Sequence, residues 1–133
     1  EIRAVPKGTG TGWVYDGEGH IITNYHVIEG ANALIVRFIE GTEVPAKVVG
    51  ADPGTDVAVL QVDLPKQKQQ ALVALKRGES APLSVGQEVY AIGNPFGLDH
   101  TLTKGIVSGV GRTIMSIGGR PIQGAIQTDA SIN

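Results

Sequence analysis

The chain has 133 residues, with 11 basic and 13 acidic side chains and a formal net charge of -2, so it lacks the basic stripe that nucleic-acid-binding proteins need. Hydrophobic residues make up 41% and charged residues 18% of the sequence, which is typical of a folded globular chain and excludes a disordered one. No apolar run approaches the roughly 20 residues that span a bilayer, and the absence of cysteine excludes disulfides and thiolate zinc sites.

Short runs rich in β-branched and aromatic residues, separated by glycine and proline, predict an all-β fold. The turns expected at Asp16–Gly19, Glu40–Thr42 and Gly93–Gly97 contain residues that tolerate positive φ or fix φ. Many short strands at this spacing are typical of barrels or sandwiches. In chain order, we expect strands over residues 12–15, 19–23, 33–38, 43–49, 57–62, 88–92, 102–110 and 125–128.

Two segments depart from this β pattern. His26–Gly30 closes on a glycine and predicts a single helical turn at the end of a strand. Asp63–Gln70 contains Pro65 and several lysine and glutamine residues without apolar periodicity, which predicts an exposed link. We expect this link to divide the chain into two halves.

His26 follows an apolar strand directly, where packing fixes a side chain that can still reach a cleft. Asp56 precedes another apolar run, and a carboxylate at that position needs hydrogen-bond donors. A histidine N–H is one such donor, and the pairing would orient a general base. Alternatively, Asp56 only caps the turn Asp52–Thr55, and spacing alone leaves these two interpretations nearly even. Asp52 competes as the partner of His26, but the proline that follows it favours a turn role.

The other candidate sites have simpler interpretations. His20 follows a turn and His100 lies in a polar loop, and both are expected to be ordinary surface or core histidines without a catalytic role. The histidines form no HxH or HxxxH pair, so no metal site is expected. The glycine-rich stretch Gly8–Gly12 precedes a strand instead of a helix, which disfavours a nucleotide-binding loop.

Four motifs in order resemble those of the Deg/HtrA (Do-like) serine proteases, which have the chymotrypsin fold. They are TNYHVIEG at 23–30, DPGTDVAVLQV at 52–62, AIGNPFGLDHTLTKGIVSGVGR at 91–112 and IQTDASIN at 126–133. The resemblance covers almost the whole chain. The resemblance to the sequences of chloroplast and cyanobacterial Deg proteases is greatest in two stretches, GNPFGLDHTLT and GRPIQ.

The resemblance implies that His26 is the general base and that Asp56 orients it. It implies a chymotrypsin-like double β-barrel without metal or organic cofactor. Residues 1–70 would form the complete first barrel, and residues 71–133 only part of the second. The catalytic cleft would lie between the barrels.

The sequence departs from the family at the nucleophile. The family pattern places GNSGG within about four residues of IQTDA-x-IN, and that motif is absent from these 133 residues. No serine lies in a Gly-x-Ser-Gly turn, so none is assigned as the nucleophile, and the oxyanion hole is missing with it. We therefore expect this chain alone to be inactive. The serines of the chain are Ser80, Ser84, Ser108, Ser116 and Ser131.

Two further residues have roles suggested by the resemblance. Ser131 would form the floor of the primary specificity pocket, where a small neutral side chain suits a small or medium apolar substrate residue. The Gly105–Gly124 region resembles the mobile activation loops, in which Arg112 would either help to order the site or remain a solvated surface residue.

At the level of the whole protein, the resemblance implies protein quality control by degradation of unfolded or damaged polypeptides. It also implies a homo-oligomer such as a trimer, a periplasmic or chloroplast (thylakoid lumen) location, and a companion C-terminal segment that completes the second barrel. No PDZ sequence is present in this chain. The alternative is a non-catalytic module that keeps the protease fold, binds polypeptides or assembles with active subunits.

Overall fold

The computed structural model describes residues 1–5, 8–94, 100–116 and 118–132. The chain forms two compact units, Glu1–Lys76 and Arg77–Asn133, and each is treated by itself. The exposed link predicted at residues 63–70 belongs to the last part of the first unit. Most of the turn expected at Gly93–Gly97 lies outside the described residues.

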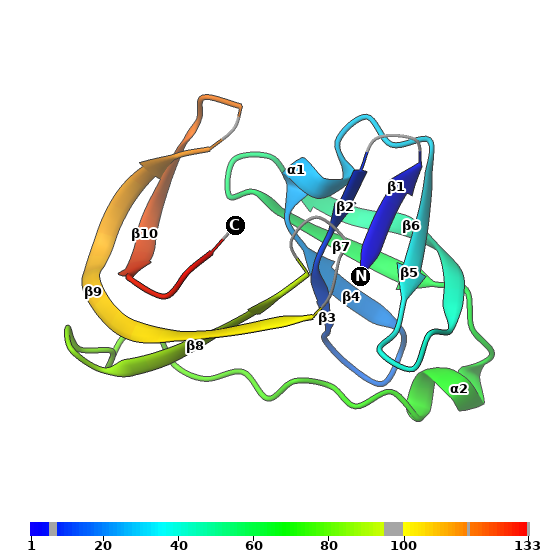
Figure 1. Cartoon of the computed structure of the whole chain (residues 1–133). Helices are drawn as coiled ribbons and strands as arrows, with labels where there is room; N and C mark the ends of the chain where they lie inside the picture. Colours follow the sequence, from blue (N-terminus) through cyan, green and yellow to red (C-terminus); the bar gives the residue numbers. More distant parts are fainter. Residues whose placement is uncertain (6–7, 95–99, 117, 133) are drawn as a thin grey trace. The chain divides into compact units, whose positions relative to one another are not determined.

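The first unit is an antiparallel barrel (Figure 1). Its sheet has the order β2-β1-β5-β6-β7-β4-β3. The strands at the two ends of this order, β2 and β3, are separated in the chain only by Thr11, so the backbone itself joins the ends and closes the sheet. The strands are β1 (Ile2–Val5), β2 (Gly8–Gly10), β3 (Gly12–Val14), β4 (His20–Thr23), β5 (Ala33–Arg37), β6 (Glu43–Asp52) and β7 (Val57–Val62).

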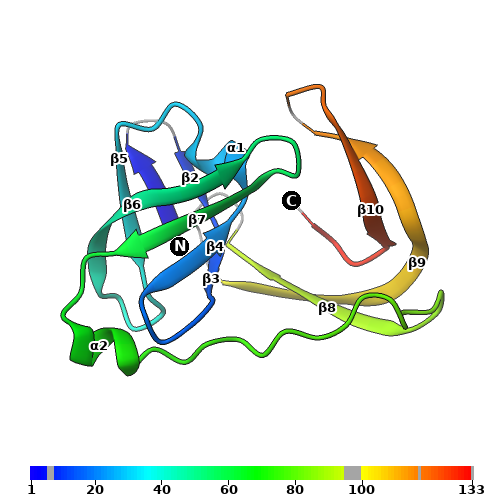
Figure 2. The same ribbon diagram turned by 180° about the vertical axis from the view of Figure 1, so that it is seen from behind.

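Strand β7 shows why this sequence folds as a barrel. Figure 2 shows β7 between β6 and β4, its partners on either side. Ala58, Leu60 and Val62 are 0%, 0% and 1% exposed, while Val57 on the opposite face is 39% exposed. This period of two directs every second side chain into the core. The other buried apolar residues of this core are Ile2, Ile21, Ile28, Leu34, Val36 and Val44.

We expect Leu60→Ala to destabilise the first unit strongly. The substitution leaves a cavity in a fully buried position, and such changes cost about 2–5 kcal/mol in the free energy of unfolding. Urea denaturation followed by circular dichroism measures the loss. Val57→Ala, on the exposed face of the same strand, should cost only about 0.5 kcal/mol, and an equal loss in both variants would contradict this account of the core.

The two helices are short. Helix α1 (Tyr25–Ile28) is the single turn expected from the sequence, beginning one residue earlier than predicted. Helix α2 (Lys66–Gln70) was not predicted, because its residues have no apolar period and none of them is buried. Pro65 precedes it with φ -55, which suits a helix start, and lysine and glutamine are good helix formers. Neither helix in the described part of the chain is long and apolar enough to cross a membrane.

The sequence also missed the first two strands. Strand β2 is a Gly-Thr-Gly segment with low intrinsic strand propensity. Its place in the sheet comes from pairing with β1, which in turn pairs with β5. Tertiary hydrogen bonding therefore decides the conformation of this segment.

The second unit contains a curved three-stranded antiparallel sheet with the order β10-β9-β8. Its strands are β8 (Glu88–Gly93), β9 (Thr101–Met115) and β10 (Pro121–Thr128). Strand β9 continues well beyond the predicted end at residue 110, and β10 lies beside its second half, from Val107 to Met115 (Figure 1). Gly111 and Gly124 have φ of 65 and 73, and the β9–β10 register shifts at Ala125 and Gln127. These irregularities allow the long hairpin to bend.

Candidate active site

His26 is held at the surface by the anchored turn α1. Ile28, two residues later, is 7% exposed and belongs to the core of the first unit. The Val27 side chain packs over Gly10, where an added Cβ would lie 2.6 Å from both Val27 methyl groups. The His26 side chain remains 39% exposed. Packing of its neighbours therefore fixes the position of His26 while its ring stays accessible to solvent.

Asp56 has a left-handed backbone conformation. Its φ is 59, the only positive φ of a non-glycine residue among those described. The Asp56 carbonyl oxygen accepts hydrogen bonds from Tyr25 N–H at 3.1 Å and from the Asn24 side-chain amide at 3.0 Å. Aspartate tolerates this region better than most residues, and such conformations occur often at functional sites. The donors around α1 stabilise this conformation of Asp56.

Both oxygens of the Asp56 carboxylate bind His26. Oδ1 accepts the His26 backbone N–H at 2.8 Å, and Oδ2 lies 2.6 Å from His26 Nδ1. An ionised carboxylate only accepts hydrogen bonds, so the proton of the neutral imidazole lies on Nδ1 and the lone pair on Nε2. The Asp56 side chain is only 14% exposed. The pair thus combines a shielded carboxylate with an accessible basic nitrogen.

The competing candidate, Asp52, has a different environment. Its Oδ1 accepts Gly54 N–H at 2.9 Å, and its Oδ2 accepts the Thr55 hydroxyl at 2.9 Å. These bonds organise the turn that leads to Asp56. The structure therefore places Asp52 in the turn and Asp56 against His26.

His20 pairs with a second carboxylate. Its Nδ1 lies 2.7 Å from Asp16 Oδ2, while Asp16 Oδ1 accepts the Glu18 and His20 backbone N–H groups at 2.9 and 3.2 Å. Burial pushes the pKa of Asp16 upward, but these hydrogen bonds outweigh it and hold that pKa below its usual value. Ligand atoms of Asp16, Glu18 and His20 lie within 4.8 Å of one another, the one such group in the described part of the chain.

We expect Asp16→Asn to reduce the pH dependence of stability. Because the pKa of Asp16 is lower in the folded state, its carboxylate stabilises the fold above about pH 4 and loses this effect as pH falls through the lowered pKa. The variant should lose up to about 1 kcal/mol of unfolding free energy at pH 7, and less at pH 3. Urea titrations at both pH values measure this difference. Asp63→Asn, at an exposed position, is the control, and the same loss at both pH values in Asp16→Asn would contradict the linkage.

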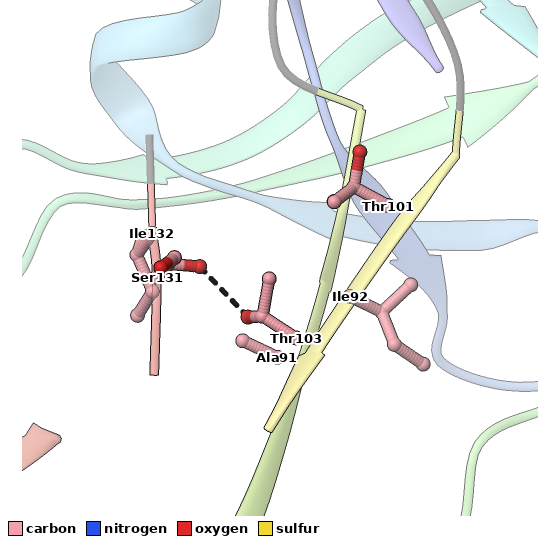
Figure 3. Close-up of a pocket in the computed structure, with 7 residues that line it drawn as sticks. Ala91, Ile92, Thr101, Thr103, Ser131 and Ile132 are labelled. Carbon is pink, nitrogen blue, oxygen red and sulfur yellow. Dashed lines mark hydrogen bonds between the residues drawn. The ribbon is translucent and has the colours of Figure 1, made fainter. Parts of the chain in front are cut away.

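Ser131 lines a small cavity of about 70 Å³ in the second unit (Figure 3). The cavity wall carries aliphatic groups and threonine side chains, without a charged side chain among its lining residues. Thr103 donates its hydroxyl to the Ser131 carbonyl oxygen at 2.7 Å, which joins two sides of the cavity. Its lining residues are Ala91, Ile92, Gly93, Thr101, Thr103, Ser131 and Ile132.

The remaining predicted candidates lie at or near the surface. His100 and Arg112 are exposed, and Arg112 folds back along β9 so that a Cβ added to Gly109 would lie 2.5 Å from its Nε. Ser116 Oγ accepts Arg120 N–H at 3.1 Å within a turn. The role of Arg112 in ordering the site stays a prediction. The other serines, Ser80, Ser84 and Ser108, also belong to the second unit.

Sequence reasoning missed the contribution of Asn24. Its side chain is the donor to the Asp56 carbonyl, across 32 positions in the chain. The one indication in the sequence was that Asn24, a polar residue, lies between a predicted strand and the candidate histidine. It did not identify the partner, because that bond depends on the unusual backbone conformation of Asp56.

Residues 10–133 match the family described as trypsin-like peptidase domain. Protease Do-like 1, chloroplastic, of Arabidopsis thaliana is 56% identical over 134 residues, covering 100% of this chain and 30% of its own length. The probable periplasmic serine endoprotease DegP-like of Pseudomonas putida is 46% identical over 127 residues, covering 96% of this chain and 25% of its own. The chain therefore spans less than a third of either relative.

Solved structures show the same architecture. The crystal structure of Deg5 has a TM-score of 0.80 at 44% identity, covering 99% of this chain and 67% of that one. The HtrA-type protease AlgW with decapeptide has a TM-score of 0.79 at 41% identity, covering 95% and 36%. These similarities confirm the predicted all-β, chymotrypsin-like fold, with the second barrel only partly present. The chain belongs to the trypsin-like peptidase domain family and, within it, to the Deg/HtrA (Do-like) serine proteases.

Proposed function

We propose that this chain carries the general base and the orienting carboxylate of a serine endopeptidase that degrades unfolded or damaged polypeptides. The observation that carries the proposal is the double contact of Asp56 with His26, at 2.8 Å to the backbone N–H and 2.6 Å to Nδ1. Because Asp56 contacts the backbone N–H and Nδ1, it does not occupy Nε2, the other nitrogen of this accessible ring. The names of the relatives, serine endoprotease and protease, agree with such chemistry.

In the proposed reaction, His26 Nε2 takes the proton of a serine hydroxyl as its oxygen attacks the scissile carbonyl carbon. The resulting imidazolium is stabilised by the Asp56 carboxylate. His26 then gives the proton to the leaving amine as the C–N bond breaks, which leaves an acyl-enzyme. Water attacks this ester with His26 again as base, and the serine recovers its proton.

We assign the nucleophile and the oxyanion hole to residues outside these 133. The sequence contains no Gly-x-Ser-Gly turn, and the relatives that it matches are more than three times longer than the aligned region. In this proposal the chain by itself does not cleave peptides, and a further C-terminal segment supplies the missing groups.

Ser131 is proposed as part of the primary specificity pocket. The cavity that it lines is small, and none of its lining residues in the described part of the chain is charged, which suits a small uncharged aliphatic side chain before the scissile bond. Cleavage of a peptide library by the complete enzyme tests this assignment. Alanine and valine are expected at that position, and a strong preference for lysine or arginine would refute it.

The partners and location are proposed from the relatives. We propose that the protein acts in the bacterial periplasm or in the chloroplast, because the relatives are named as periplasmic and chloroplastic proteases. A homo-oligomer, such as a trimer, is proposed from the family resemblance alone. We also propose that the first barrel ends and the second begins near residue 70.

The function is tested on the complete natural protein with a fluorophosphonate probe and with unfolded casein as substrate. We expect stoichiometric labelling of one serine outside the 133 residues, and cleavage of casein that the probe abolishes. A complete protein that binds casein but is neither labelled nor active would instead be a non-catalytic polypeptide-binding module. Labelling of a serine within the 133 residues would overturn the assignment of the nucleophile.

A further inference from the structure

The segment that follows β10 is fastened to β9 by side chains. Thr128 donates its hydroxyl to the Ile106 carbonyl oxygen at 2.8 Å. Ile106 N–H donates to Asp129 Oδ1 at 2.7 Å, and Thr103 donates to the Ser131 carbonyl oxygen at 2.7 Å. Where β10 ends, these three side-chain bonds add to a long backbone bond from Asp129 N–H to the Ile106 carbonyl oxygen at 3.4 Å. We call Thr103, Thr128 and Asp129 the segment clamp.

Gly105 in β9 has no side chain, which allows the backbone of Asp129 and Ala130 to approach β9 closely. A Cβ at residue 105 would overlap Ala130 N and the Asp129 carboxylate. Ala130 is 6% exposed, and its N–H donates to the Thr128 hydroxyl at 3.1 Å. The backbone of residues 128–131 is therefore packed directly onto β9, in a position that a side chain at residue 105 would prevent.

Thr103 connects the clamp to the cavity that Ser131 lines. Its side chain lines the cavity, and its hydroxyl holds the Ser131 carbonyl on the other side (Figure 3). Ile132, the next residue, also lines the cavity. The length of one hydrogen bond consequently sets the separation between the β9 wall and the segment that carries Ser131.

We propose that Thr103 and Asp129 are positioning residues that set the width of this cavity, and thereby restrict it to small aliphatic side chains before the scissile bond. This inference rests on the proposed function, because it treats the cavity as a substrate subsite. Thr103 acts by donating to the Ser131 carbonyl, and Asp129 acts by holding the preceding residues on β9. Without either bond, the segment moves away from β9 and the cavity admits larger side chains.

The test uses the complete natural protein and two peptides that differ only in alanine or leucine before the scissile bond. Thr103→Val keeps the shape of the side chain but removes the donor. We expect its ratio of kcat/KM for alanine over leucine to fall by about fivefold to tenfold, as for the loss of one ordering hydrogen bond, mainly through KM. Thr103→Ser restores the donor and should return the ratio to within about twofold of the parent.

Two further variants separate positioning from general damage to the fold. Thr113→Val removes an exposed threonine hydroxyl from the same strand and should leave the ratio unchanged. Asp129→Asn keeps the shape of that side chain and weakens its bond to Ile106, so the ratio should shift in the same direction as in Thr103→Val. If Thr103→Val does not fold, as judged by its melting temperature, Asp129→Asn decides the question. A parental ratio in every folded clamp variant overturns the inference while the protease activity stands.

Hydrogen exchange of residues 128–132 distinguishes the structural role of the segment clamp from its role in substrate selectivity. We expect faster exchange in Thr103→Val than in Thr113→Val. If the complete parent protein neither cleaves nor reacts with the fluorophosphonate, the proposed function and the selectivity role fail together, and faster exchange then supports only the structural clamp. Equal exchange in Thr103→Val and Thr113→Val would overturn the clamp itself.

Discussion

His26→Ala in the complete protein should lower kcat/KM for peptide cleavage by about 10⁴-fold or more, the cost of removing the base from a catalytic triad. The nitrogen that takes the serine proton disappears, and the Asp56 carboxylate loses the imidazole that it orients. The fold should survive, because the His26 side chain is 39% exposed and lies outside the core. Steady-state kinetics, fluorophosphonate labelling and thermal melting measure these effects.

His100→Ala provides the matched control for this experiment. His100 is exposed and has no assigned role, so its removal should change kcat/KM by less than about twofold, as expected for a surface substitution. If His26→Ala kept a tenth of the parental activity with its fold intact, His26 would not be the general base.

Most strands of the first unit could be predicted because their information is local, whereas the barrel was implied by the family resemblance. Alternation of buried and exposed residues in β7 follows directly from the sequence Val-Ala-Val-Leu-Gln-Val. Strand β2 depends instead on pairing with β1, which itself pairs with the distant β5, and the extension of β9 depends on pairing with β10 and on bends at glycine. Propensity within a short window contains no information about such partners.

The candidate site shows the same division between local and distant information. His26 and Asp56 could be named as candidates because each joins a polar group to the end of an apolar run, and the family resemblance then assigned their roles. The bond from Asn24 to the Asp56 carbonyl, which supports this pair, joins residues 32 positions apart and needs the left-handed Asp56 before the donor faces its acceptor. In the second unit, the bond from Thr103 to the Ser131 carbonyl likewise joins residues 28 positions apart.

Asp56→Asn should lower kcat by about 10⁴-fold, as expected for a wrong histidine tautomer, although the two side chains have nearly the same shape. The asparagine side chain has one acceptor oxygen and one amide donor, whereas the Asp56 carboxylate accepts from two groups of His26. The His26 backbone N–H can only donate, so the asparagine oxygen must face it and the asparagine NH₂ group must face Nδ1. The imidazole then accepts at Nδ1 and carries its proton on Nε2, where it cannot accept the serine proton.

This reasoning predicts a spectroscopic change as well as a kinetic one. In ¹⁵N NMR of labelled histidine, the neutral His26 ring should carry its proton on Nδ1 in the parent and on Nε2 in Asp56→Asn, while KM stays nearly constant. Asp52→Asn is the control, since the Asp52 carboxylate accepts from Gly54 and Thr55 within the turn and the substitution should leave the tautomer unchanged. An Asp56→Asn enzyme that keeps the parental tautomer and a kcat within about tenfold of the parent would show that Asp56 does not orient the base.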